Sequence, residues 1–180
     1  MTFSDKSPRD VQVELSPARS FSGWLDLPYD RSADGQAGTD PSLPLLVVGG
    51  GPAGLAAMAA LDEAGIAFEA VESHSQVGGI WDESNPLSSI YEGLCTVTSR
   101  FTSHLGTPMP ADWPNYPHHS QAREYFVNFA RSRGLESKIR FSTRFETATK
   151  TARGTWIAQL KRTDRDESLE REYRGVAIAT

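Results

Sequence analysis

The sequence has little cysteine, and it has no long hydrophobic run. Its one cysteine, Cys95, cannot form a disulfide within the chain, and one thiol is not a metal site. We interpret Cys95 as a small buried residue in a strand-like run. No apolar stretch approaches the roughly 20 residues that a membrane helix needs, and the N-terminus lacks the basic start and apolar run of a signal peptide. We therefore expect a cytoplasmic protein without a membrane segment.

Basic residues and catalytic patterns are also scarce. The 18 Lys and Arg against 23 Asp and Glu give a net charge of −5, which argues against nucleic acid as a partner. His118 and His119 are adjacent, and in an extended loop they would point apart, so we expect no metal site. No nucleophile–base set and no pair of cysteines can be assigned. Composition and pattern therefore leave the catalytic residues unknown, and they leave an oligomer possible.

The apolar share of 38% is low for the single domain that 180 residues predict. The shortage lies in residues 1–44, which are rich in Ser, Asp, Pro and Gly. We interpret this segment as a disordered leader, because it has too little apolar surface to offset the entropy of ordering. The alternative is that its aromatic residues, such as Trp24, dock as an arm on the folded part or on a partner. In both interpretations, residues 45–180 form the ordered domain.

The strongest structural signal is a β-α-β unit near the start of that domain. Residues 43–48 form the short apolar run expected of a parallel strand that is buried on both faces. A glycine-rich turn follows, and apolar residues then recur at helical spacing until Gly65. A second strand is predicted over residues 67–72. This order is typical of an α/β fold with a parallel sheet.

The rest of the chain departs from a simple repeat of this unit. Residues 73–120 contain Gly, Pro, Ser and Trp but no convincing helix. A helix is predicted over residues 121–133, with Tyr125, Phe126, Phe129 and Ala130 facing inward. Short strands follow at 139–141, 144–149, 155–160 and 170–173, and the mixed charges of 161–167 indicate a solvated hairpin turn. Residues 176–180 are predicted to form a central parallel strand.

A nucleotide-binding motif sits between the first strand and the first helix. The pattern G-x-G-x-x-G runs from Gly49 to Gly54 and includes Gly50, Gly51, Pro52 and Ala53. In this context its glycines allow a tight turn and the close approach of a pyrophosphate to the helix N-terminus. Glu72 ends the second strand, near the spacing expected of the acid that binds a ribose. Because a carboxylate would repel a 2′-phosphate, the site should hold FAD or NAD rather than NADP.

Beyond these residues the sequence resembles the flavin-containing monooxygenases and the related Baeyer–Villiger monooxygenases. The resemblance is carried by Gly78-Gly79-Ile80-Trp81 and by the segment from Pro108 to Pro117, which contains Pro-Met-Pro and ends in Tyr-Pro. It continues at His119, Gln121 and Tyr125, and it finishes at Ala179-Thr180. It thus covers about residues 45–180, all of the predicted ordered part.

The resemblance implies a fold, two cofactors and a reaction. The fold would be a Rossmann-type FAD-binding half-domain of a flavoprotein with two dinucleotide-binding domains, followed by a small antiparallel β-meander. A complete enzyme would use FAD, NADPH and O₂ to oxygenate a small-molecule substrate with a nucleophilic N or S atom. The resemblance implies that the pyrophosphate is held by Gly49, Gly50, Gly51, Pro52, Ala53 and Gly54, and the ribose by Glu72. It also implies that Ile80 and Trp81 line the flavin side, that Thr96, Val97 and Thr98 pass beside the isoalloxazine and the nicotinamide, and that the backbone of Phe145 contacts the adenine.

The sequence also departs from the family's pattern. Val97 stands where the family commonly has Asn, and valine cannot form the hydrogen bond of that amide. The second glycine motif, for NADPH, is absent, so we expect a truncated domain that does not turn over by itself. A Baeyer–Villiger ketone monooxygenase and a non-catalytic FAD-binding fragment are the alternatives. Residues 94–119 could also form a surface loop without ligand contact.

Overall fold

The computed structural model of this chain describes residues 40–180. The predicted leader, 1–44, lies almost entirely outside the described residues, and so does Trp24 of the alternative docked arm. Both interpretations therefore stay predictions.

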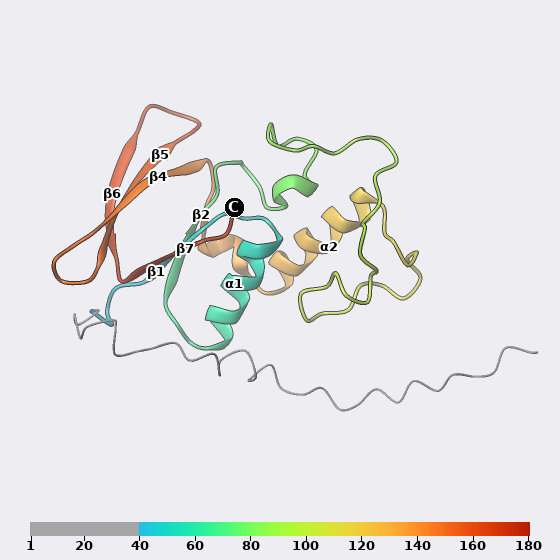
Figure 1. Ribbon diagram of the computed structural model, residues 1–180, viewed down its shortest axis with the longest axis horizontal. Coiled ribbons are helices and arrows are strands. Elements are labelled where there is room, and N and C mark those ends of the chain that lie inside the picture. The colour runs from blue at the N-terminus through green and yellow to red at the C-terminus, as the bar shows by residue number, and fades with distance from the viewer. Residues whose placement is uncertain (1–39) are drawn as a thin grey trace, which may run out of the picture. The chain divides into compact units, whose positions relative to one another are not determined.

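The described residues form a mixed α/β fold of two sheets and two α-helices, as the sequence predicts (Figure 1). In chain order the elements are β1 (Leu45–Val48), α1 (Pro52–Glu63), β2 (Phe68–Val71), the 3₁₀ turn η2 (Gly79–Trp81), α2 (His119–Ser132), the 3₁₀ turn η3 (Leu135–Lys138), β3 (Ile139–Arg140), β4 (Thr143–Lys150), β5 (Trp156–Arg162), β6 (Ser168–Tyr173) and β7 (Gly175–Ile178).

The first sheet is parallel and has the order β3-β2-β1-β7. The predicted β-α-β unit is β1, α1 and β2, and Val47 of β1 lies opposite Ala70 of β2 and Ala177 of β7. The parallel strand predicted over 176–180 is present as β7, which pairs with β1 and lies at the edge of the sheet within the described residues. Ile178 is accordingly 60% exposed.

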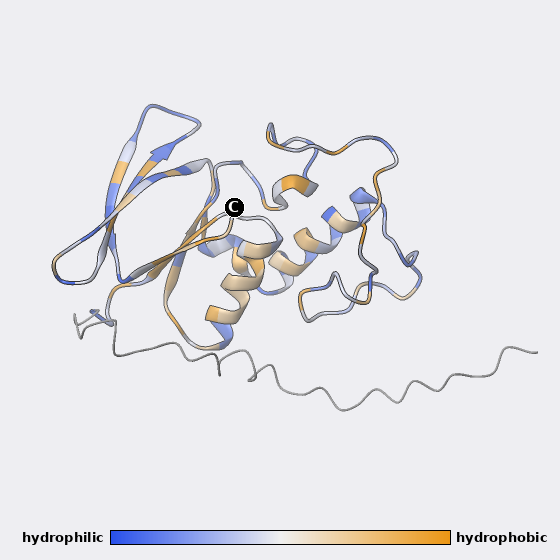
Figure 2. Cartoon of the chain, viewed as in Figure 1, coloured by the Kyte–Doolittle hydropathy of each residue, from blue (hydrophilic) through white to orange (hydrophobic). Residues whose placement is uncertain are grey.

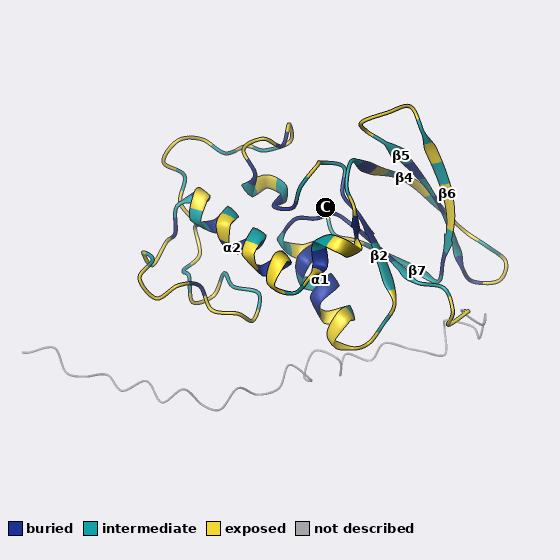
Figure 3. Ribbon diagram, turned by 180° about the vertical axis from the view of Figure 1, so that it is seen from behind, coloured by how far each residue is buried: buried dark blue, intermediate teal, exposed yellow. Residues whose placement is uncertain are grey.

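Both faces of this sheet are covered, which explains why β1 is apolar throughout. Val47 packs into a core shared with α1 and α2, whereas Leu46 and Val48 pack with residues of β5 and β6. This alternation follows from the two-residue period of a strand. Hydrophobic residues concentrate on α1 and on the parallel strands (Figure 2). Helix α1 buries Gly54, Leu55, Met58 and Ala59, whereas its last residues, 62–63, are exposed (Figure 3).

The second sheet is the predicted antiparallel meander, with the order β4-β5-β6. Its hairpin turn is shorter than expected, because Lys161 and Arg162 pair with β4 and leave only residues 163–167 in the turn. Arg171 and Tyr173 of β6 both donate hydrogen bonds to Glu69 of β2, at 2.8 and 3.1 Å. These bonds join the meander to the parallel sheet.

Helix α2 buries the face that its sequence predicts, with Tyr125, Phe126, Phe129 and Ala130 all buried. His118 is its N-cap: the ring Nδ1 accepts a hydrogen bond from the Ser120 N–H, and Gln121 Oε1 accepts one from the His118 N–H. None of the helices in residues 40–180 combines the length and the apolar character needed to cross a membrane.

Candidate functional site

The turn after β1 brings three segments of backbone together. Gly49 has a φ of +112°, and its N–H donates to the carbonyl of Val71 at 2.9 Å. A Cβ on Gly54 would lie 1.9 Å from the Gly49 carbonyl oxygen, so only glycine lets α1 start this close to the turn. A Cβ on Gly51 would meet nothing nearer than the Gly79 Cα, at 3.5 Å. Gly54 is therefore required by the fold, whereas the fold would accept a small side chain at Gly51.

The N-terminus of α1 opens onto a cavity of about 590 Å³. Gly51 is the N-cap and Pro52 the first helical residue, and the first turn contains no acidic side chain. The first intrahelical N–H is that of Leu55, which bonds to Gly51. The N–H groups of Ala53 and Gly54 thus have no partner within the helix, and the helix dipole adds positive potential at this end. Such an end suits a phosphate.

The cavity lies beyond the carboxyl ends of the parallel strands, where ligands of open α/β sheets generally bind. Its lining comes from the turn after β1, from the end of β2, from η2 and the loop after it, from the start of β4 and from the end of β7. The lining residues are Val48, Gly49, Gly51, Pro52, Ala53, Val71, Glu72, Ser73, Gly79, Ile80, Asn85, Leu87, Thr143, Arg144, Phe145, Ile178, Ala179 and Thr180.

Glu72 contributes a buried carboxylate to this cavity. It is 6% exposed. Its Oε2 accepts a hydrogen bond from the Gly50 N–H at 2.6 Å, and its Oε1 accepts from the His74 N–H at 2.7 Å and from the Ser73 hydroxyl at 3.0 Å. A carboxylate has about four acceptor positions, so about one is left for a donor in the cavity. The protein therefore fixes the orientation of the carboxylate before any ligand binds.

Seven of the predicted site residues line this cavity together: Gly49, Gly51, Pro52, Ala53, Glu72, Ile80 and Phe145. Gly50 and Gly54 do not line the cavity but support it. The Gly50 N–H holds the Glu72 carboxylate, and Gly54 lets α1 start close to Gly49. The remaining four, Trp81, Thr96, Val97 and Thr98, line a separate, mainly apolar cavity of about 150 Å³. Ile80 and Trp81 are neighbours in sequence, but η2 directs them to different cavities.

The smaller cavity lies between η2, α2 and the segment 94–98. The ring of Trp81 packs near that of Phe126, with centroids 6.4 Å apart. Thr96 is buried, and its hydroxyl donates to the carbonyl of Thr98 at 2.8 Å. Val97 is 92% exposed, so it contributes nothing to the core.

Two of the sequence predictions in this region are wrong. Cys95 is exposed rather than buried, because its segment forms a single bridge with His118 at the surface instead of a strand in a sheet. The rings of His118 and His119 do not point apart: their centroids are 3.9 Å apart, because helix α2 begins between them. Within residues 40–180, no group of three His, Cys, Asp or Glu side chains is arranged to hold a metal ion.

Sequence reasoning did not assign several lining residues. The rule that strand ends converge could have found residues 178–180, because they end a predicted parallel strand. The structure explains why residue 79 is glycine. A Cβ there would lie 2.9 Å from the Gly51 Cα, so only glycine lets η2 pack against the turn. Asn85 and Leu87 lie in an irregular loop, and no periodicity marks them.

Comparison with known proteins places this site in context. A family model described as flavin-binding monooxygenase-like matches residues 44–172. Flavin-containing monooxygenase 3 of Oryctolagus cuniculus is 29% identical over 131 residues, which are 68% of this chain and 25% of that protein. The chain thus spans about a quarter of the length of the curated relatives it matches.

Solved structures share the fold. The S-allyl-L-cysteine S-oxygenase of Allium sativum aligns with a TM-score of 0.67 at 22% identity, over 76% of this chain and 36% of that one. OTEMO in complex with FAD and NADP aligns with a TM-score of 0.62 at 22% identity, over 78% of this chain and 26% of that one. These likenesses concern the arrangement of helices and strands.

Proposed function

Since this chain belongs to the flavin-binding monooxygenase-like family, we propose that residues 45–180 are the FAD-binding part of a monooxygenase. The enzyme would use NADPH and O₂ to oxygenate a small substrate at a nucleophilic N or S atom. The observation that carries the proposal is the 590 Å³ cavity, which the glycine turn, the start of α1 and the buried Glu72 carboxylate all face. These are the groups that a dinucleotide needs.

The cavity fits the adenosine diphosphate half of FAD. Gly51 leaves the backbone open to a pyrophosphate, and the free N–H groups of Ala53 and Gly54 can donate to it. Glu72 has about one acceptor position left, which a ribose hydroxyl can fill. The backbone of Phe145, which also lines the cavity, would contact the adenine. The same carboxylate disfavours a 2′-phosphate, which supports FAD over NADP at this site.

Bound FAD would supply the redox chemistry, by accepting a hydride from NADPH and activating O₂. The residues of this chain would bind and orient it. Ile80 would border the flavin side of the cavity, and Thr96, Val97 and Thr98 stay our prediction for the region beside the isoalloxazine and nicotinamide rings. The Thr96 hydroxyl already donates to a backbone carbonyl, so toward a ligand it would act only as a hydrogen-bond acceptor.

The nucleotide that the purified chain carries tests this proposal. We expect heat denaturation to release FAD, identified by chromatography and mass. Glu72→Gln should release at least tenfold less, because an amide replaces a charged oxygen that accepts buried hydrogen bonds. Release of NAD, or of no nucleotide even after incubation with FAD, would contradict the proposal.

A further inference from the structure

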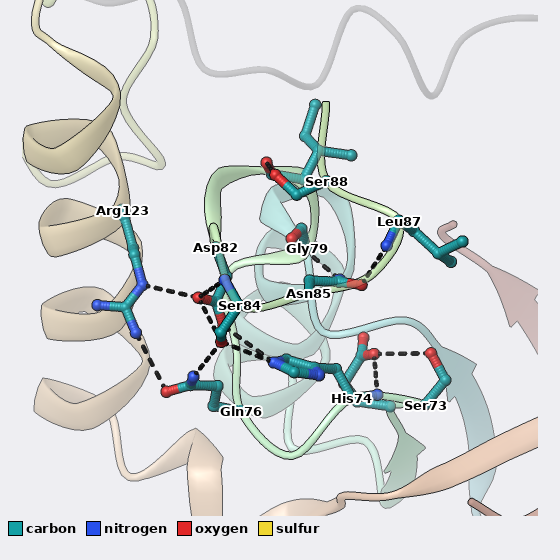
Figure 4. Close-up of polar contacts among 12 residues, drawn as sticks. Ser73, His74, Gln76, Gly79, Asp82, Ser84, Asn85, Leu87, Ser88 and Arg123 are labelled. Atoms are coloured by element: carbon teal, nitrogen blue, oxygen red, sulfur yellow. Dashed lines mark hydrogen bonds and ion pairs between the residues drawn. The ribbon is translucent and has the colours of Figure 1, made fainter. Parts of the chain in front are cut away.

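A second buried acid, Asp82, lies behind the wall of the cavity. It directly follows η2 and is 2% exposed. Its Oδ1 accepts hydrogen bonds from the N–H and the hydroxyl of Ser84, at 3.1 and 2.9 Å, and from Arg123 Nε on α2, at 3.2 Å (Figure 4). Its Oδ2 lies 3.2 Å from His74 Nε2, without the geometry of a hydrogen bond. Asp82 therefore gathers groups from three segments of the chain.

One connection leads from Asp82 to the Glu72 carboxylate. The His74 ring lies beside Asp82 and within 3.1 Å of the Ser84 hydroxyl, while the His74 N–H donates to Glu72 Oε1. Gln76 closes the network, since it donates to the Ser84 hydroxyl at 2.8 Å and accepts from Arg123 at 3.1 Å (Figure 4). His74, whose backbone N–H orients the Glu72 carboxylate, is thus held in place through its ring.

A second connection leads to the loop that forms one wall of the cavity. The Asp82 side chain holds Ser84 within this loop. The backbone of Asp82 adds two bonds: its N–H donates to the Gly79 carbonyl, and its carbonyl accepts from the Asn85 N–H at 3.0 Å. The Asn85 amide in turn donates to the Gly79 carbonyl at 3.1 Å and accepts from the Leu87 N–H at 3.0 Å. Gly79, Asn85 and Leu87 all line the cavity, whereas Asp82 does not.

Hydrogen bonds from Ser84, together with nearby charges, keep Asp82 an anion despite its burial. Burial by itself raises the pKa of Asp82, but the Ser84 hydrogen bonds and the charges of Arg123 and His74 outweigh it, and the pKa is lowered. A buried carboxylate held by an arginine is costly to disrupt, because removal of one partner leaves the other uncompensated. The network is therefore suited to hold a fixed geometry.

We propose that Asp82 is a positioning residue of the nucleotide site, whose side chain fixes the Glu72 carboxylate through His74 and the Gly79–Leu87 wall through Ser84, the residue before Asn85. This rests on the proposed function for the identity of the ligand, FAD. Asp82 touches no part of the cavity itself. Its effect on binding would come from pre-organisation, since a loop and a carboxylate that are already ordered lose less entropy when the ligand binds.

The test compares three variants of the 180-residue chain: Asp82→Ala, Asp82→Asn and Asp166→Asn. Asp166 is the matched control, because its side chain is fully exposed in the β5–β6 turn. We expect Asp82→Ala to weaken FAD binding at least tenfold in a fluorescence titration. Asp82→Asn should recover most of the affinity, because the amide oxygen can still accept from Ser84 and Arg123. Asp166→Asn should bind as the wild type does.

Amide hydrogen exchange measures the same variants without ligand. In Asp82→Ala, exchange should rise at least fivefold at His74 and across 79–87 and stay unchanged in β5. Equal FAD affinity and equal exchange in Asp82→Ala and the wild type would overturn the inference. If Asp82→Ala fails to fold, Arg123→Met takes its place with the same expectations. If the wild type binds no FAD, the proposed function fails, and the exchange result alone decides whether Asp82 fixes the wall.

Discussion

At the residue scale, the glycine motif divides into positions that the fold requires and positions that a ligand requires. A Cβ on Gly54 would overlap the backbone of Gly49, whereas a Cβ on Gly51 would make an ordinary contact. The G-x-G-x-x-G spacing predicted both roles from sequence. The spacing could not predict the hydrogen bond from the Gly50 N–H to the Glu72 carboxylate or the network around Asp82. Those contacts join segments that are far apart in sequence, through irregular loops.

These two glycines give a direct prediction. Gly54→Ala should lower the free energy of unfolding by about 3 kcal/mol or more, because the new methyl group meets a backbone oxygen that cannot move freely. Gly51→Ala should change it by less than about 1 kcal/mol, because its backbone is extended and the space is open. Urea unfolding of both variants measures the difference. Equal losses would show that the turn does not have the geometry described here.

At the element scale, period and capping predicted the helices and strands well, and the loops poorly. The inward face of α2 follows from its 3.6-residue period, and β1 is apolar throughout because the sheet is covered on both faces. The hairpin turn was predicted too long because Lys161 and Arg162 are charged, although exposed strands accept charged residues. Cys95 was misplaced because an apolar run of a few residues does not distinguish a strand from a loop.

The contact between β6 and β2 predicts a dependence of stability on alkaline pH. Burial, and then the nearby Glu69 carboxylate, raise the pKa of Tyr173 to about 12 from 10.0. Folding therefore favours the protonated phenol, and this contribution is complete below pH 10 and is lost as the pH rises through 12. Tyr173→Phe should cost about 1 kcal/mol at pH 8, through the lost hydrogen bond to Glu69. The difference from the wild type should shrink by pH 11.

Urea unfolding at pH 8 and pH 11 provides this comparison. Tyr91→Phe is the control, because Tyr91 is largely exposed and its substitution should leave the free energy of unfolding within about 0.5 kcal/mol of the wild type at both pH values. A Tyr173→Phe difference that is the same at both pH values would contradict the account of this contact.

At the scale of the whole molecule, the described residues are organised around one end of the parallel sheet. The turn after β1, the acid after β2 and residues 178–180 after β7 meet there, and the meander and η2 complete the cavity. Sequence predicted the fold class and seven of the residues that line this cavity. It did not separate them from the four that line the smaller cavity, because resemblance assigns residues to a cofactor but not to a position in space.

The most direct test of the account is a competition titration of the 180-residue chain with FAD. Because the cavity offers its turn, helix start and buried carboxylate to an adenosine diphosphate, we expect saturable binding of one FAD per chain. ADP should displace the FAD, whereas FMN, which carries the flavin ring but no adenosine, should not. Displacement by FMN as effective as that by ADP, or no saturable binding of FAD, would contradict the assignment of this cavity.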